Sequence, residues 1–197
     1  MLHADYSRKH FQKYLSFKGR VNFLVNLVGS VLGNDRKKIK LLSVGPRFES
    51  ELYGYRGLGM RWKNIQAIDT YSYSPKISVG NMHQIEYPDK YFNIVVCGWT
   101  LAYSKNPLLA LGEFERILAT NGLLIITWDL PSSFDASLFP ALTLNRRNEI
   151  DDPASSIEDP NIFDLVSKFF CVNRLEIGKL DFYGETPFAT LILKKYS

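Results

Sequence analysis

Apolar residues follow two alternating patterns along most of this chain, one typical of buried strands and the other of helices with one apolar face. Mainly apolar runs at 40–44, 65–69 and 93–99 predict strands, and the continuous run at 93–99 is expected to be buried on both faces, as parallel strands are. Apolar residues at helical spacing predict helices at about 49–58 and 107–118. This alternation is typical of a doubly wound sheet whose parallel strands are joined by right-handed crossovers.

Four further segments complete the predicted sheet. They are a short strand at 77–79, a strand at 123–128 after an Asn121-Gly122 turn, and two antiparallel strands at 171–178 and 188–194 joined by a turn with Gly184 and Pro187. A helix opened by Asp159-Pro160 and running to Phe170 precedes the last two strands. The predicted fold class is therefore α/β: a Rossmann-like, doubly wound, seven-stranded and mostly parallel sheet with a C-terminal antiparallel hairpin and helices on both faces.

Residues 1–34 precede this alternation and are predicted to form two helices. Aromatic and apolar residues recur at helical spacing over 5–17, Gly19 interrupts them, and a second apolar stripe runs from Val21 to Leu32. We expect the second helix to pack against the sheet. The first helix either packs in the same way or acts as a lid over a site.

Residues 130–160 interrupt the pattern later in the chain. Four prolines, two serine pairs and several acidic residues predict a loop with one helical turn at 138–144. A loop of this length inside a compact domain is usually functional or mobile. We expect a single domain over residues 1–197, in which 40–197 form the core and this loop is an insertion.

The composition is that of an ordinary globular protein, with 46% hydrophobic and 22% charged residues. The net charge is +4, and the densest basic cluster, at 36–38 with Lys40, precedes the first predicted strand. We interpret this cluster as a solvated connector, because no RNP-like or helix-turn-helix signature accompanies it. Nucleic acid is therefore not an expected partner.

The two cysteines and the distribution of charge bear on where the protein works. Cys97 and Cys171 lie in apolar runs without paired spacing, so we expect both to be reduced and buried. Charged residues near the start exclude a signal peptide, and the most apolar helical segment, 21–33, is too short to span a bilayer. The expected location is cytoplasmic, with no membrane partner.

One strand–turn–helix unit carries the clearest chemical signal. The strand at 40–44 stops at Gly45-Pro46, and a helix starts near Glu49. A strand, a tight glycine turn and a helix N-terminus form a cradle for an adenosine-containing cofactor. Asp69 ends the next strand, 24 residues after Gly45, where a carboxylate is placed to bind ribose hydroxyls. The absence of a GxGxxG motif disfavours an NAD-dependent oxidoreductase.

Three blocks over residues 40–128 make the chain resemble the class I S-adenosylmethionine-dependent methyltransferases of the small methyltransferase-11 type. The first block is the unit of strand, Gly45, helix and Asp69. The second, GNMHQIEYPDKYFNIVVCGWTLAYSKNP, resembles the family's run from the adenine-contacting loop to strand four. The third, ALGEFERILATNGLLIITW, is similar to the family's helix, arginine–aliphatic–leucine triplet, glycine turn and strand five.

The resemblance implies S-adenosylmethionine as the cofactor and assigns residues to its parts. It implies that Gly45 approaches the methionine moiety, Asp69 binds the ribose, Tyr71 and Met82 lie against the adenine, Asn81 accepts from the adenine amino group, and Trp99 lies near the sulfonium end. Aromatic side chains stabilise a nearby sulfonium cation by about 0.5–2 kcal/mol each.

The glycine turn departs from the family pattern. Ser43 stands where the family has an acid, and Arg47 and Glu49 stand where it repeats glycine. One reading is that Arg47 reaches the cofactor carboxylate and Glu49 caps the helix, so that the turn still binds. The other is that these side chains fill the pocket.

The predicted activity follows from these two readings. The first hypothesis is a methyltransferase that acts on a hydroxyl or amine of a small molecule or glycan precursor, with His83, Tyr103 and Asp129 as candidate general bases. The second is a catalytically degenerate binding or scaffolding protein of the same fold. WTLAYS follows strand four in place of an asparagine-proline-proline-tyrosine signature, which makes a nucleic-acid nitrogen a less favoured acceptor. The three histidines lack metal-ligand spacing, so no metal site is expected.

Overall fold

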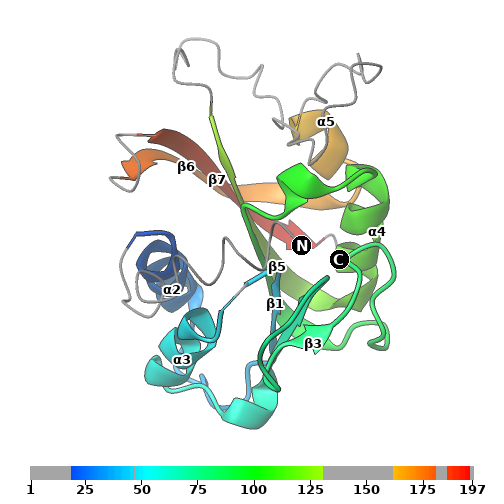
Figure 1. Ribbon diagram of the computed structural model, residues 1–197. Helices are drawn as coiled ribbons and strands as arrows, with labels where there is room; N and C mark the ends of the chain where they lie inside the picture. Colours follow the sequence, from blue (N-terminus) through cyan, green and yellow to red (C-terminus); the bar gives the residue numbers. More distant parts are fainter. Residues whose placement is uncertain (1–18, 47, 131–161, 181–185, 196–197) are drawn as a thin grey trace.

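The computed structural model describes residues 19–46, 48–130, 162–180 and 186–195. They form a seven-stranded sheet of order β3-β2-β1-β4-β5-β7-β6, with helices on both faces (Figure 1). The strands are β1 (Leu41–Val44), β2 (Ile65–Asp69), β3 (Ser78–Val79), β4 (Phe92–Gly98), β5 (Leu118–Asp129), β6 (Phe170–Leu180) and β7 (Thr186–Lys195). The first five strands are parallel, and β7 is antiparallel to both β5 and β6. The predicted fold class is confirmed.

The described helices are α2 (Arg20–Val31), α3 (Ser50–Gly57), α4 (Pro107–Ile117) and α5 (Ile162–Val166), with 3₁₀ turns η1 (Trp62–Asn64) and η2 (Leu101–Tyr103). Among them, α4 begins where the local sequence favours a helix start. At the start of α4 the Asn106 side chain accepts a hydrogen bond from the Leu109 N–H at 3.1 Å. Pro107 occupies the first turn of this helix, where a missing N–H costs nothing.

Two hydrophobic clusters fill the two sides of the sheet. The neighbours Leu41 and Leu42 point to opposite faces of β1, as the period of a strand requires, and both are fully buried. Leu42 packs in the cluster with Phe114 of α4, and Leu41 in the cluster with Val28 of α2 and Tyr55 of α3. Each such side chain contributes roughly 1.5–3 kcal/mol to folding. The predicted packing of the second N-terminal helix against the sheet is therefore confirmed.

The junction of α4 and β5 differs from the prediction. β5 begins at Leu118, directly after α4, so that Asn121-Gly122 lies inside the strand instead of before it. Asn121 has φ 61°, which asparagine tolerates better than most residues, and the pairing with β4 shifts register between Phe92 and Ile94. The residues that predict a turn here make a local irregularity within one continuous strand.

The C-terminal hairpin is confirmed, with three corrections. The described part of the preceding helix ends at Val166, because β6 begins at Phe170. Pro187 lies in β7 instead of the turn. A proline has no N–H to donate, but the pairing of β7 with β5 ends at Phe188, so no hydrogen bond to β5 is lost at this position. Cys171 is exposed on the edge strand β6, whereas Cys97 is buried.

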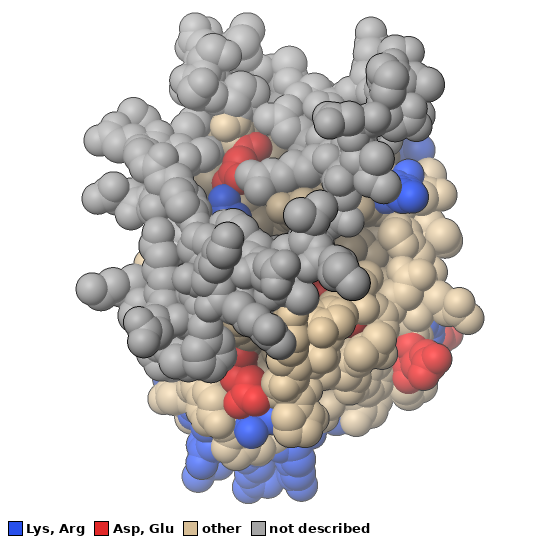
Figure 2. Space-filling model, in the orientation of Figure 1, with Lys and Arg blue, Asp and Glu red and all other residues tan. Residues whose placement is uncertain are grey.

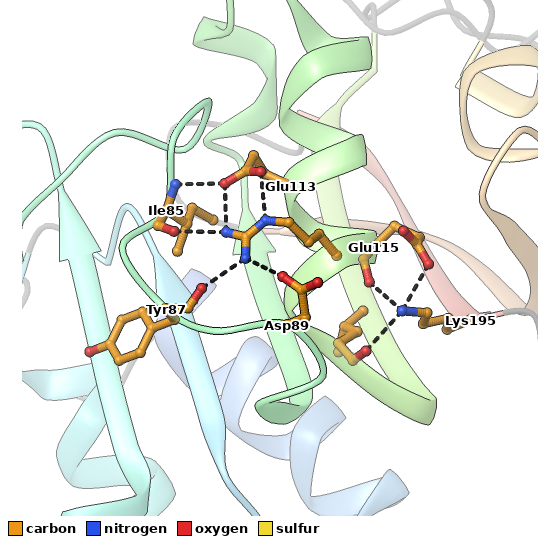
Figure 3. Close-up of polar contacts among 8 residues, drawn as sticks. Ile85, Tyr87, Asp89, Glu113, Glu115 and Lys195 are labelled. Carbon is orange, nitrogen blue, oxygen red and sulfur yellow. Dashed lines mark hydrogen bonds and ion pairs between the residues drawn. The ribbon is translucent and has the colours of Figure 1, made fainter.

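Lys195 joins the end of β7 to the end of α4 (Figure 3). Its Nζ donates to the main-chain oxygens of Glu115 at 2.7 Å and Leu118 at 3.0 Å, and pairs with the Glu115 carboxylate at 2.8 Å. A lysine at this place satisfies carbonyl groups that a helix C-terminus leaves without partners.

The predicted helix at 5–17, most of the loop at 130–160, and Arg47 lie outside the described residues. Among the helices that are described, none has both the length and the apolar character that a membrane span requires.

Candidate functional site

The candidate site lies where the order of the parallel strands reverses, between β1 and β4. To one side of this point the sheet continues with β2 and β3, and to the other with β5. In open α/β sheets, ligands bind outside the carboxyl ends of the strands at such a point. Gly45, Asp69 and Trp99 stand at the carboxyl ends of β1, β2 and β4. The fold therefore brings these three predicted residues to one edge of the sheet.

Gly45 makes a turn that no other residue type fits. Its φ is +71°, in the left-handed region, and its N–H donates to the Ile68 oxygen at 2.8 Å. A Cβ on Gly45 would lie 2.3 Å from Thr100 Oγ1 and 2.4 Å from Thr100 Cγ2. The side of this glycine that lacks a side chain thus faces the loop after β4, and the two ligand-side loops are packed directly together.

Asp69 ends β2 beside the Gly45 turn, with its side chain half-buried. Its Oδ1 lies 3.5 Å from the Tyr71 N–H and 3.4 Å from Thr70 Oγ1, and both contacts are at the long limit of hydrogen bonding. Tyr71 and Tyr73 follow on the same loop; each ring is about half exposed, and their centroids are 4.6 Å apart. This end of β2 therefore presents a carboxylate next to two accessible aromatic rings.

Glu49 precedes α3 but does not cap it with its side chain, so the predicted capping is wrong. The carboxylate instead accepts a hydrogen bond from the Ser74 hydroxyl and pairs with Lys76 Nζ at 3.4 Å. The hydrogen bond from Ser74 is the main reason why the pKa of Glu49 is lowered. Glu49 therefore links the start of α3 to the loop after β2.

A buried acid that the sequence patterns did not reveal lies under the Gly45 turn. Glu51, in the first turn of α3, is 5% exposed, and its Oε1 accepts hydrogen bonds from Ser43 Oγ and Tyr55 Oη, both at 2.6 Å. Burial raises the pKa of Glu51, and it raises that of Tyr55 well above the usual value. Glu51 of α3 thus places a carboxyl group beside Ser43, the strand position at which the family pattern has an acidic residue. The signal available in the sequence was an acidic residue in the first turn of the next helix, eight residues after an unexpected serine.

The loop after β3 carries Asn81, Met82 and His83. Asn81 Oδ1 accepts hydrogen bonds from the His83 main-chain N–H at 2.9 Å and from His83 Nδ1 at 2.8 Å. A carbonyl oxygen has two lone pairs, so both are used within the loop and neither is directed to a ligand. Met82 is buried in the core that contains Leu42 and Ile68.

The hydrogen bonds of His83 define its tautomer. Because a main-chain N–H donates to Asn81 Oδ1, that atom is the amide oxygen, and the adjacent His83 Nδ1 carries the proton. His83 Nε2 then accepts from the hydroxyl of Ser104, 2.7 Å away at the end of η2. Ser104 is buried, and it also accepts from the Asn106 N–H at 3.2 Å. The imidazole therefore connects the loop after β3 to the loop after β4.

Arg116 holds the loop between β3 and β4 against α4 (Figure 3). Its two terminal nitrogens donate at 2.8 Å to the main-chain oxygens of Tyr87 and Ile85. Both also bind carboxylates, those of Asp89 and Glu113, and Glu113 in turn accepts from the Ile85 N–H at 2.7 Å. This network fixes the segment that leads from His83 into β4.

Trp99 has a left-handed backbone, with φ +60°, directly after β4. Its Nε1 donates to Asp129 Oδ1 at 2.6 Å, and the guanidinium of Arg20 lies 4.5 Å from its ring centroid. The same guanidinium donates to both oxygens of Asp129 at 2.8 Å. A bulky residue in this conformation is maintained only where its surroundings hold it, and such residues concentrate at functional sites. Asp129 thus joins Arg20 of α2 to Trp99 after β4.

Tyr103 lies in η2 between Trp99 and Ser104, and its ring is half-buried. Within the ranges that the structure describes, no group of three histidine, cysteine, aspartate or glutamate side chains is arranged to hold a metal ion.

Residues 60–126 match the family model for a methyltransferase domain, and these residues make up about a third of the chain. The [4+2]-cyclase SpnF is similar to the chain with a TM-score of 0.61 and 16% identity, over 87% of this chain and 79% of that one. A SAM-dependent methyltransferase from Methanosarcina mazei is similar with a TM-score of 0.60 and 15% identity, over 86% of this chain and 96% of that one. The chain has the methyltransferase fold. A putative sarcosine dimethylglycine methyltransferase from Galdieria sulphuraria is similar with a TM-score of 0.59 and 13% identity, over 89% of this chain and 84% of that one.

No protein with a curated description matches the chain significantly. The methyltransferase domain and fold imply S-adenosylmethionine as the cofactor, but one neighbour described as a cyclase shows that this fold does not by itself determine the reaction. The residues present fit the cofactor at its ribose side, where the Asp69 carboxylate stands half-exposed at the end of β2. At the adenine side the oxygen of Asn81 is already used by His83.

Proposed function

We propose that the protein transfers a methyl group from S-adenosylmethionine to a hydroxyl or amine of a small molecule or sugar. The observation that carries this proposal is the Asp69 carboxylate beside the Gly45 turn, at the reversal point of a sheet with the methyltransferase fold. A charged acceptor at this place suits the two hydroxyls of a ribose. The buried Glu51 supports the proposal, because it supplies an acid beneath the turn where Ser43 replaces the family's own.

The bound cofactor supplies an electrophilic methyl group on a sulfonium centre. The task of the protein is to align the acceptor about 3 Å from that methyl group and to exclude water. Trp99, Arg20 and Asp129 form one bonded unit at the ends of β4 and β5, in which the buried Trp99 ring already holds the Arg20 guanidinium 4.5 Å from its centroid. We propose that this unit borders the methyl end of the site.

Among the three candidate bases, the contacts favour His83. Asp129 is held as a carboxylate by a guanidinium and an indole N–H, which makes it a poor proton acceptor. With the Nδ1 proton bound by Asn81, His83 Nε2 accepts from the Ser104 hydroxyl, so His83 would take up a substrate proton only through Ser104. A hydroxyl acceptor needs such a base more than an amine does.

Titration calorimetry with S-adenosylmethionine and with its demethylated product tests the proposal. Both ligands should bind, and Asp69→Ala should weaken binding by about 1.5–3 kcal/mol, roughly tenfold to 150-fold. Asp35→Ala is the matched control, because Asp35 is an exposed acid before β1, at the opposite end of the sheet. Absence of heat and of any thermal shift at millimolar ligand would refute cofactor binding. Equal losses in the two variants would refute the role of Asp69.

A further inference from the structure

A basic surface lies at the end of the sheet opposite the candidate site. It consists of residues 33–40, which lead into β1, and residues 56–63, which run from the end of α3 into η1 before β2. β1 and β2 are parallel neighbours, so both segments lie at the amino ends of adjacent strands. We call these two segments the basic face. Figure 2 shows lysine and arginine side chains gathered at the bottom of the molecule.

Hydrogen bonds join the two segments into one surface. Asn64 Nδ2 donates to the Lys37 oxygen at 2.8 Å, and the Arg36 guanidinium donates to the Leu58 oxygen at 3.2 Å. The Arg56 guanidinium donates to the Met60 oxygen at 3.1 Å. These contacts hold guanidinium groups on a rigid framework while their side chains stay exposed.

The charge of the molecule is concentrated on this face. The two segments contain seven basic residues, Arg36, Lys37, Lys38, Lys40, Arg56, Arg61 and Lys63, and one acid, Asp35. The rest of the chain holds 17 basic and 19 acidic residues, so the positive net charge comes entirely from the basic face. A concentration of one sign on one side attracts polyanions and accelerates their association.

Two exposed aromatic rings adjoin the cations. Trp62 is 38% exposed and packs edge-on against Tyr53, with ring centroids 5.1 Å apart. Trp62 lies between Arg61 and Lys63 of the basic face. Lys76, which is outside this face and pairs with Glu49, has its Nζ 5.9 Å from the Trp62 ring centroid. Cations that track a phosphate backbone, combined with aromatic rings that stack on bases, are the means by which proteins bind single strands. A membrane-inserting amphipathic helix has a continuous apolar face, and 33–40 has Ile39 as its only large apolar side chain.

We propose that the basic face binds single-stranded nucleic acid, with its cations on the phosphates and Trp62 against a base. The sequence alone favours a solvated connector at 36–38, because the basic residues are dispersed along the chain. Folding adds Arg56, Arg61 and Lys63 to that cluster. This surface is separate from the candidate methyl-transfer site and does not depend on it.

Fluorescence anisotropy with a fluorescein-labelled, mixed-sequence RNA of about 20 nucleotides tests the proposal, without cofactor and between 50 and 200 mM salt. The wild type should bind, with log affinity falling linearly against log salt. The variant Lys37→Glu/Arg61→Glu/Lys63→Glu should bind at least tenfold more weakly, and its salt slope should be about 2 smaller, at about 0.7 for each lost phosphate contact.

The matched control is Lys105→Glu/Lys168→Glu/Lys194→Glu, which changes the net charge equally at exposed lysines outside the basic face. It should stay within about threefold of the wild type, as expected if location and not net charge decides binding. Trp62→Ala should weaken binding roughly fivefold or more without changing the slope. Circular dichroism melts establish that each variant is folded, and glutamine substitutions replace the reversals if the triple variant is not.

Three results would overturn the proposal. The first is no binding by the wild type at 50 mM salt. The second is an equal loss in the two triple variants. The third is that the basic-face variant loses binding to phosphatidylserine vesicles while its RNA binding is unchanged.

Discussion

Replacing Gly45 by alanine tests how closely the two loops of the candidate site are packed. The left-handed φ of +71° costs a residue with a Cβ about 1–2 kcal/mol. The new Cβ would also lie within 3.0 Å of three Thr100 side-chain atoms, at 2.3, 2.4 and 2.8 Å, and overpacking of this kind costs typically ~1–3 kcal/mol. The free energy of unfolding should therefore fall by roughly 2–5 kcal/mol, and each kcal/mol corresponds to about 2–4 °C in melting temperature.

A double variant separates the two contributions. Thr100→Gly removes the atoms that the new Cβ meets, so Gly45→Ala in that background should lose only the cost of φ. Urea unfolding followed by circular dichroism should show that the double variant is about 1–3 kcal/mol more stable than the sum of the single changes predicts. Gly57→Ala is the control, because a Cβ there meets nothing within 4 Å, and it should be neutral or slightly stabilising. Additivity within about 0.5 kcal/mol would refute the packing argument.

Three further predictions concern Glu51, Arg116 and the two cysteines. Burial raises the pKa of Glu51, so the folded state holds its proton more tightly than the unfolded state, and stability from this group is lost as pH rises above about 4.5. Glu51→Gln should therefore gain stability relative to the wild type between pH 5 and pH 8 in urea unfolding, and a constant difference would contradict this. Arg116→Lys should lose roughly 2–4 kcal/mol, because an ammonium cannot replace the fork that binds two carbonyls and two carboxylates; a loss below about 0.5 kcal/mol in the same assay would contradict the network. Burial raises the pKa of Cys97 to about 12, so a thiol reagent at pH 8 should react quickly with the exposed Cys171 and with Cys97 only on unfolding. Rapid reaction of two thiols per folded chain would contradict this.

Much of the sheet could be predicted because strands and helices have different hydrophobic periods. β2 begins and ends at the predicted residues, and β1, β4, α3 and α4 agree within one or two. The errors arose where a local signal competed with long-range pairing. Asn121-Gly122 favours a turn by itself, but Leu118 before it already pairs with Phe92 of β4, and Leu123 after it pairs with both β4 and β7. Cys171 follows the apolar pattern of a strand, but β6 lies at the sheet edge, and no pattern within the strand reveals that position.

The candidate site was predictable as a set of positions but not as a set of contacts. The spacing along the chain predicted that Gly45, Asp69 and Trp99 lie at one edge of the sheet, because the carboxyl ends of parallel strands lie side by side. It did not reveal that Glu51 supplies a buried carboxyl to Ser43, or that Arg20 and Trp99 hold Asp129. Arg20 and Asp129 are 109 residues apart, and the sequence around either residue does not indicate the other.

The sequence by itself determined the fold class and the edge of the sheet at which chemistry is expected, since both depend on hydrophobic period and strand order. Only the tertiary structure decided what each polar side chain contacts. It turned the Asn81 oxygen towards His83, and it gathered basic residues from two separate segments onto one face. The physical reason is that burial is specified residue by residue, whereas hydrogen bonds and electrostatic fields depend on groups that only folding brings within reach.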